Sequence, residues 1–339
     1  MTKAEYKKNL KGFAIIGCAV RNSHVFYFIA RNLKQAEKAS AISEESVGKR
    51  ILPFFLDKPA DGHNPRDGRW SASKLTGFGR LVGSASKLPI EKMVAVDGMS
   101  LVYAIGSGSS GIESPISELL GREAVGAITR VRTINDYIYA VGSAHTVCRR
   151  LGNNEWESLN FNLPRETQEI FDDEDLSYDM DFSDIAGFSP DDLYTVGGRG
   201  IVWHFDGKKK EWAQMKFPSD MYLWSVCCAG DGNVYIGAQS GTLFCGRENK
   251  WEMIHRGEFS LPFKDIVWHA GKVWCTSDYG LWTVEDGKLV SADVPAEITV
   301  CAGHLSVGDG VMLIAGDGGA AFHDGEKWQV IFNRLEMES

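Results

Sequence analysis

The amino-acid sequence predicts an all-β fold, a β-propeller with seven four-stranded blades. Short apolar runs bounded by glycine recur roughly every forty residues along the 339-residue chain, which also holds ten Trp and ten Tyr. Aromatic residues in short runs between glycines are typical of strands. Four short strands in a repeat of about forty residues match the period of a propeller blade, whereas helical solenoids of similar period need a helical periodicity that these units lack.

The clearest repeat unit lies over residues 192–212. An apolar strand ends at Gly197, a second strand follows, an Asp206-Gly207 turn comes next, and the unit closes at Trp212. Further apolar strands that end in glycine occur at 101–106, 137–142, 234–237 and 311–316. The closing aromatic recurs as Trp70, Trp156, Trp251 and Trp328, and Leu289 takes its place in one copy.

Residues 223–254 show the four strands of a unit most plainly. Asp-Gly, Gln-Ser-Gly and Glu-Asn stand at the joints between apolar runs. These are hairpin turn residues, and glycine suits such joints because it adopts positive φ without strain. One four-stranded sheet cannot bury both of its faces, so the copies must stack against one another.

The closing positions give the number and the limits of the blades. They predict one domain over 1–339, with an acidic insert at 163–184 and a degenerate closing position near Ile116. The predicted blades are 11–75, 76–122, 123–162, 182–217, 218–256, 257–294 and 295–334. Because 71–90 fit the four-strand pattern poorly, six blades with an irregular cap are the alternative.

The unit from Leu193-Tyr194-Thr195-Val196-Gly197 to Trp212 resembles the WD40/YVTN/BNR-like propeller superfamily. It is most similar to bacterial propellers whose blades end in a DG-x-W strand. The resemblance covers 100–334 and, more loosely, 11–75, and the WD dipeptide of standard WD40 repeats does not occur. It implies a fold rather than a function, because such propellers serve as scaffolds, inhibitors, lyases and hydrolases.

Composition narrows the classes of partner. The formal net charge is −9, which argues against nucleic acid because phosphate binding needs a basic face. No apolar run approaches the ~20 residues of a membrane span. The run before Cys18 resembles a lipoprotein cleavage box but is too short for a signal segment, so it is expected to form the first strand. The seven cysteines show no CxxC spacing and are expected to be reduced thiols in a cytoplasmic protein.

The strongest local anomaly is the stretch 166–184. Nine of its nineteen residues are acidic and none is basic. It is either a solvated insertion or a docking surface for a basic protein. Calcium binding is a third possibility, although the glycine of an EF-hand loop is missing. The candidate partner-binding residues are Glu169, Phe171, Asp172, Asp173, Glu174, Asp175, Tyr178, Asp179 and Asp181.

No catalytic motif accompanies this anomaly. GxSxG and HExxH do not occur, and the Gly-rich run 106–111 lacks the lysine of a phosphate-binding loop. His204 and His323 fall at equivalent places in the repeat, which favours a structural role. We therefore assign no catalytic residue, no metal ligand and no cofactor.

These observations, with the resemblance, lead to a functional expectation. The regular fold, the missing catalytic signature and the acidic stretch favour a non-enzymatic propeller, monomeric on its own, that binds a protein and not nucleic acid or a membrane. Because propellers of this type occur as neutralising partners of toxins, the most specific expectation is an immunity-type inhibitor of a basic toxin. The alternatives are a glycoside hydrolase or polysaccharide lyase with its site at the channel mouth, and an assembly scaffold.

Overall fold

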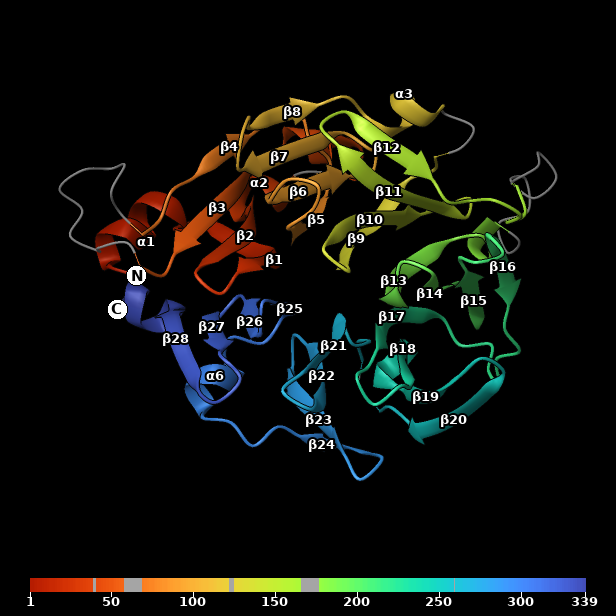
Figure 1. The fold of residues 1–339 in the computed structure, drawn as a ribbon. Helices are drawn as coiled ribbons and strands as arrows, with labels where there is room; N and C mark the ends of the chain where they lie inside the picture. Colours follow the sequence, from red (N-terminus) through yellow and green to blue (C-terminus); the bar gives the residue numbers. More distant parts are fainter. Residues whose placement is uncertain (39–40, 58–68, 122–124, 166–176, 259) are drawn as a thin grey trace.

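The computed structural model of the chain describes residues 1–38, 41–57, 69–121, 125–165, 177–258 and 260–339. Seven antiparallel four-stranded sheets surround a common axis, and the first strand of each sheet lies nearest to it (Figure 1). This confirms the predicted all-β class and the seven four-stranded blades.

The sheets follow one another in chain order. The first three contain β1 (Phe13–Asn22), β2 (Val25–Asn32), β3 (Lys49–Phe55) and β4 (Ser73–Leu75); β5 (Leu81–Ser86), β6 (Lys92–Asp97), β7 (Val102–Gly106) and β8 (Gly111–Glu113); β9 (Ile128–Ile134), β10 (Tyr137–Gly142), β11 (Thr146–Gly152) and β12 (Glu155–Ser158). The next two contain β13 (Phe182–Ser189), β14 (Asp192–Gly197), β15 (Ile201–Asp206) and β16 (Glu211–Gln214); β17 (Leu223–Cys228), β18 (Val234–Ala238), β19 (Leu243–Arg247) and β20 (Lys250–His255). The last two contain β21 (Asp265–His269), β22 (Lys272–Ser277), β23 (Gly280–Glu285) and β24 (Lys288–Ser291); β25 (His304–Gly308), β26 (Val311–Gly316), β27 (Gly319–His323) and β28 (Trp328–Asn333).

The second strands form the core of the blades. β18 and β26 are buried along their whole length, because each lies in the middle of a sheet that packs against a sheet on either side. A strand buried on both faces is expected to be continuously apolar rather than alternating. That pattern is what made 234–237 and 311–316 recognisable in the sequence.

Glycine ends several second strands for a reason other than positive φ, which is the reason that applies in the turns. Gly198 and Gly200, in the turn after β14, have positive φ as expected. Gly197 does not have it. A Cβ atom on Gly197 would lie 1.8 Å from the carbonyl oxygen of Asp181. Here glycine is required by the close approach of two backbones, and Gly142 and Gly316 meet neighbouring carbonyls in the same way.

In the second sheet, the alignment of the repeat predicted from the sequence is wrong by one strand. From its sequence, the run 101–106 was grouped with 137–142, 234–237 and 311–316, which all lie in second strands. In the structure it lies in β7, the third strand of its sheet. The second strand is β6, which is fully buried and begins with Lys92. The misplacement arose because β6 ends in Asp97 instead of glycine, whereas β7 ends in Gly106. Ile116, the expected degenerate closing position, begins helix α3 (Ile116–Leu120).

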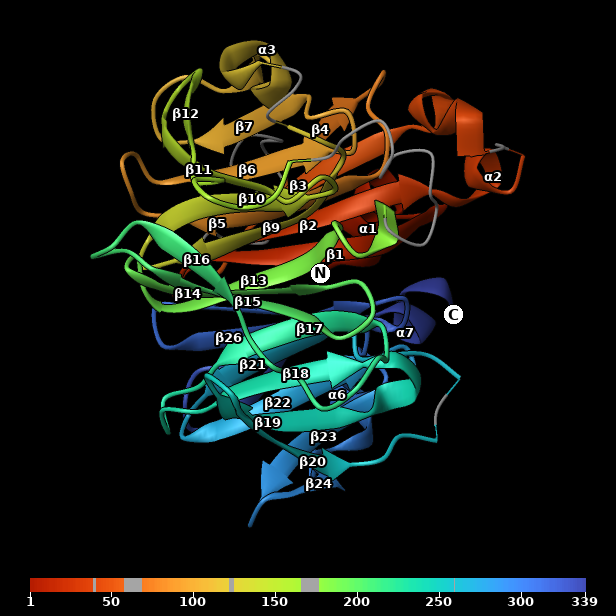
Figure 2. The same ribbon diagram turned by 90° about the vertical axis from the view of Figure 1, so that its right-hand side faces the viewer.

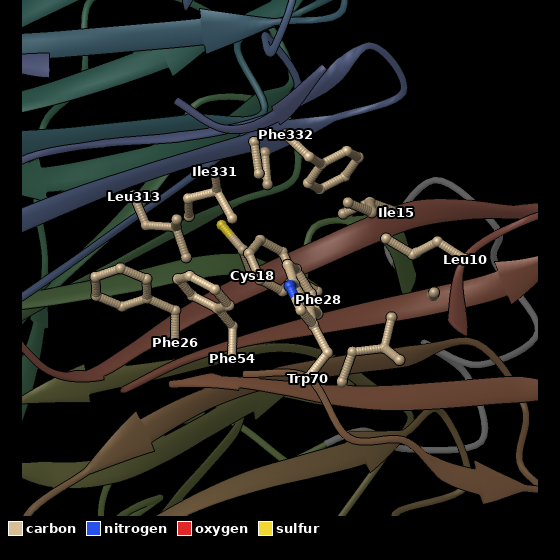
Figure 3. Close-up of a cluster of buried hydrophobic side chains, with 14 of the residues drawn as sticks. Leu10, Ile15, Cys18, Phe26, Phe28, Phe54, Trp70, Leu313, Ile331 and Phe332 are labelled. Atoms are coloured by element: carbon tan, nitrogen blue, oxygen red, sulfur yellow. The ribbon is translucent and has the colours of Figure 1, made fainter. Parts of the chain in front are cut away.

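The ring closes by packing and not by a sheet that mixes the two chain ends. In the described residues the first sheet contains β1–β4 and the last β25–β28. Their facing side chains form one hydrophobic cluster that includes Phe26, Phe54, Leu313 and Phe332 (Figure 3). Trp70, expected to close a blade, fills this cluster and bridges to Phe54 ahead of β4.

The terminal helices α1 (Lys3–Asn9) and α7 (Arg334–Glu338) reinforce this closure. Arg334 Nη2 donates to the carbonyl of Phe13 at 2.7 Å, and Arg334 Nε donates to the Tyr6 hydroxyl at 3.1 Å. The Tyr6 hydroxyl donates in turn to Glu338. The two chain ends are therefore tied by partly buried polar contacts across the first and last blades.

Antiparallel order fixes which loops share a face of the ring. The loops from one blade to the next emerge on the same face as the loops between second and third strands, and both termini lie there. We call this the insert face, because it carries the 159–181 connection. Figure 2 shows α2 (Leu33–Ala36) and α7 together on this side. Among the described residues no helix is long and apolar enough to cross a membrane.

Candidate functional site

Three of the candidate partner-binding residues lie in the described part of the chain: Tyr178, Asp179 and Asp181. Glu169, Phe171, Asp172, Asp173, Glu174 and Asp175 lie outside the described residues. The three described residues form the end of the connection that leads into β13, on the insert face.

Asp179 is held by a neighbouring blade loop. Arg199, in the turn after β14, donates from Nε to Asp179 Oδ1 at 3.2 Å and from Nη2 to Oδ2 at 3.0 Å. The backbone N–H of Arg199 donates to Asp179 as well, at 3.2 Å. A bidentate guanidinium–carboxylate pair fixes orientation as well as charge. Asp179 therefore positions the end of the acidic stretch, and much of its charge is neutralised.

Asp181 and Tyr178 have different environments. The backbone N–H of Asp181 donates to the carbonyl of Tyr178 at 3.2 Å, and the Asp181 carbonyl packs on Gly197. The Tyr178 side chain is 45% exposed, and its ring meets the Tyr222 ring edge to face at a centroid distance of 6.4 Å. Tyr178 thus offers aromatic surface to solvent near the end of the acidic stretch, and its predicted role in partner binding stays a prediction.

A second polar constellation lies at the axis of the ring, and the sequence analysis did not single it out. Arg132 on β9 donates from Nε and Nη2 to the two carboxylate oxygens of Asp184 on β13, both at 2.8 Å. The same Nη2 donates to Asp265 on β21 at 2.7 Å. Arg130 lies 3.5 Å from Asp265, and His304 Nδ1 lies 3.2 Å from it. Both carboxylates are buried.

Each of these carboxylates also joins two blades through the backbone. Asp184 Oδ2 accepts from the N–H of Val226 on β17, and Asp265 Oδ2 accepts from the N–H of Leu305 on β25, both at 3.1 Å. The signal that could have found them is a repeated tetrapeptide at the start of the first strand, Phe-Ser-Asp-Ile at 182–185 and Phe-Lys-Asp-Ile at 263–266.

The protonation state of this network opposes acid–base catalysis. Burial alone would raise the pKa of Asp265, but Arg132, His304 and Arg130 outweigh burial and hold that pKa well below its usual range. The same carboxylates raise the pKa of Arg132 above its ordinary value, against the effect of burial. A general acid of a glycoside hydrolase needs a raised carboxyl pKa and access to substrate. The carboxylates and arginines at the axis are bonded to one another.

The two repeat-equivalent histidines have different partners. His204 Nε2 lies 2.9 Å from Asp192, and its ring stacks on Tyr194. His323 Nδ1 lies 2.9 Å from His269 Nε2, between the last two blades. In the described part of the chain, no three His, Cys, Asp or Glu side chains gather as metal ligands would. All seven cysteines are free thiols.

A hollow among the described residues is lined by both chain ends and by the start of α2. It has a volume of about 880 Å³ and lies where the two termini meet. Its lining includes Lys3, Lys7, Lys11, Lys34 and Arg334, with Glu338 as its carboxylate. The insert face therefore carries a basic region at the chain ends as well as the described residues 177–181, which lead into β13.

Comparison with known proteins gives one relative by sequence. No family model matches the chain. Immune protein Tsi7 of Pseudomonas aeruginosa is 28% identical over 245 residues, which cover 71% of this chain and 76% of that protein.

Comparison by structure gives the fold alone. Virginiamycin B lyase of Staphylococcus aureus, in a catalytically inactive H270A form with quinupristin, superposes with a TM-score of 0.60 at 11% identity, covering 91% of this chain and 93% of the lyase. The WD40 propeller domain of Doa1 superposes with a TM-score of 0.58 at 10% identity, covering 90% of each chain. The chain is therefore a seven-bladed β-propeller and a distant relative of immune protein Tsi7.

Proposed function

We propose that this protein is a non-enzymatic, cytoplasmic propeller of the immunity type, which binds a basic protein toxin and neutralises it. The observation that carries the proposal is the similarity to immune protein Tsi7, which extends over most of both chains. A similarity of this extent covers several blades and so includes loops on which a binding function depends.

Charge supports the nature of the partner. The chain has a net charge of −9, and its longest departure from the repeat carries nine carboxylates without one basic residue. Complementary charge accelerates association and discriminates between partners. A neutralising protein must find its toxin quickly, so an acidic surface suits a basic toxin.

The axial network supports a non-enzymatic role. Asp184 and Asp265 are buried on first strands of their blades, and both are bonded to Arg132 and to backbone N–H groups. Groups saturated in this way stabilise the ring and are not free to transfer protons to a substrate.

Neutralisation in cells tests the proposal. The chain is tagged in its native cell, the co-eluting protein is identified, and that protein is expressed in a host with and without this chain. We expect a basic protein that arrests growth alone and is tolerated when this chain is present. A co-eluting protein that is harmless, or growth arrest that this chain does not relieve, would contradict the proposal.

A further inference from the structure

The first strand of the fifth blade presents a tryptophan at a place where the fold does not need one. In β17, Leu223 pairs with Ala238 and Ser225 pairs with Gly237, so Trp224 is left without a partner in a β-bulge. The same bulge occurs in β1, β9 and β13, where the extra residue is Ile16, Thr129 or Ser183. A bulge redirects the side chain of its extra residue.

The exposure of Trp224 points to a contact outside this chain. Its side chain is 44% exposed, whereas its neighbours Leu223 and Ser225 are buried. Thr129 and Ser183 occupy the equivalent bulges with small polar side chains, so the blade can be built without an indole there. Tryptophan is among the residues most enriched at the energetic centre of protein interfaces.

Two tyrosines extend this exposed surface. Tyr222 bridges to Arg199 just ahead of β17 and is 36% exposed. Tyr222 and Trp224 are both exposed at the start of β17, one on each side of the buried Leu223 in the sequence. The Tyr178 ring stands edge to face on Tyr222. We call these three side chains the aromatic patch.

The charges beside the aromatic patch indicate what it binds. Asp179 and Asp181 follow Tyr178 closely, and the exposed Asp220 precedes Tyr222 by two residues. Arg199 is bonded to Asp179. The face of an aromatic ring attracts Lys and Arg side chains, most strongly for Trp, and adjacent carboxylates add to this attraction. Asp179 is already paired with Arg199, so the exposed Asp220 is the carboxylate that adds to this attraction, and the surface suits cationic side chains better than it suits a phosphate.

We propose that the aromatic patch anchors the partner, and that Trp224 and Tyr178 stack on Lys or Arg side chains of a basic protein surface. This rests on the proposed function and adds the side chains that carry the contact. The acidic groups steer the partner toward the insert face, and the aromatic patch, at the start of β17, holds it there.

Site-specific crosslinking and titration test this assignment. A photoreactive p-benzoylphenylalanine is placed at residue 224 and, as a control, at residue 112, where the exposed Ile112 lies on the outer strand β8. We expect the chain modified at 224, and not the one modified at 112, to crosslink to the basic protein recovered with the unmodified chain.

Titration of that protein, produced separately, then measures the contribution of each side chain. We expect Trp224→Ala and Trp224→Leu to weaken binding by roughly thirty-fold or more, and Tyr178→Ala by roughly ten-fold. Trp224→Phe keeps a ring and should lose much less, and Ile112→Ala should bind as the unmodified chain does. A thermal melt of each variant shows that the fold is retained.

The outcomes separate the two proposals. If the unmodified chain binds a basic toxin but Trp224→Ala and Tyr178→Ala bind it equally well, the aromatic patch is not the anchor, and the proposed function stands. Equal loss in Trp224→Leu and Trp224→Phe would contradict the stacking on cations. If the unmodified chain binds no basic protein, both proposals are overturned.

Discussion

Arg132 and Asp184 join two neighbouring blades at the axis of the ring through a pair of parallel hydrogen bonds, each 2.8 Å long. Asp184 is completely buried, and Arg132 is mostly so. The same guanidinium reaches Asp265 two blades further on. One side chain thus couples the third, fourth and sixth blades.

Replacing Arg132 should be strongly destabilising. Arg132→Met leaves two buried carboxylates without their main partner, and the loss of one member of a buried pair costs about 3–5 kcal/mol. The free energy of unfolding in urea measures this loss. Arg149→Met is the matched control, since Arg149 pairs with Glu157 on outer strands where both side chains are partly exposed, and such pairs contribute at most about 1 kcal/mol. Equal losses in the two variants would refute the structural role of the axial network.

The contact between His269 and His323 should make the protein sensitive to mild acid. Burial, together with the neighbouring His323, lowers the pKa of His269 to about 4 from an ordinary value of 6.5. A lowered histidine pKa means that the unfolded chain binds the proton more readily. The resulting stability is complete above pH 6.5 and is lost as the pH falls from 6.5 toward 4. Asp265, whose pKa is also lowered, loses its contribution only below its unfolded value of 3.8.

Unfolding free energies measured between pH 4 and pH 7 check this window. We expect the unmodified chain to lose up to about 3 kcal/mol as the pH falls across it. His269→Gln should show a shallower slope and converge with the unmodified chain near pH 4. If the unfolding free energy of His269→Gln depends on pH as steeply as that of the unmodified chain, the His269–His323 pair is not the cause of the acid sensitivity.

Gly197 should not tolerate alanine. The new methyl group would overlap the carbonyl of Asp181, so β14 or the end of the acidic stretch must move, at a cost of about 2–4 kcal/mol. Thermal unfolding compares this variant with Gly98→Ala, where an added Cβ atom meets nothing within 4 Å. We expect Gly98→Ala to melt close to the unmodified chain. Similar melting of both variants would contradict the close approach described for Gly197.

The closure between the first and last blades should depend on Arg334. Arg334→Met removes its hydrogen bonds to Phe13, Tyr6 and Asp317, and we expect a loss of about 2–3 kcal/mol because hydrogen bonds of a charged group are among the stronger ones. Leu335→Ala is the control, since Leu335 is 73% exposed. Urea unfolding should separate the two variants clearly. An Arg334→Met variant as stable as Leu335→Ala would show that side-chain packing alone closes the ring.

The sequence predicted those parts of the fold that repetition exposes. Buried second strands such as β18 and β26 are short continuous apolar runs ending in a small residue, and they recur at the blade period. In the second sheet the glycine ends β7 and not β6, so the predicted alignment of that blade was wrong by one strand. The predicted number of blades was still correct, because each sheet contributes several apolar runs.

The candidate site was less accessible to sequence reasoning. The acidic stretch was visible because nine like charges in nineteen residues stand out from any repeat. Trp224 was not, because its role depends on a bulge, and a bulge is defined by pairing with another strand. The pairing of Asp179 with Arg199 likewise depends on a loop twenty residues away, so the sequence showed an acidic group and not its neutralisation.

Calorimetric titration of the basic toxin with charge-reversed chains tests the central claim most directly. Reversing Asp172, Asp173, Glu174 and Asp175 to lysine is compared with reversing four exposed carboxylates at the outer edge of the blades, Glu155, Glu211, Glu252 and Glu326. The two variants have the same net charge, so only the position of the charges differs. We predict that reversal at 172–175 weakens binding at least ten-fold more than reversal at the outer edge, with the difference shrinking at high salt. Equal affinities for the two variants would contradict docking of the toxin on the acidic stretch.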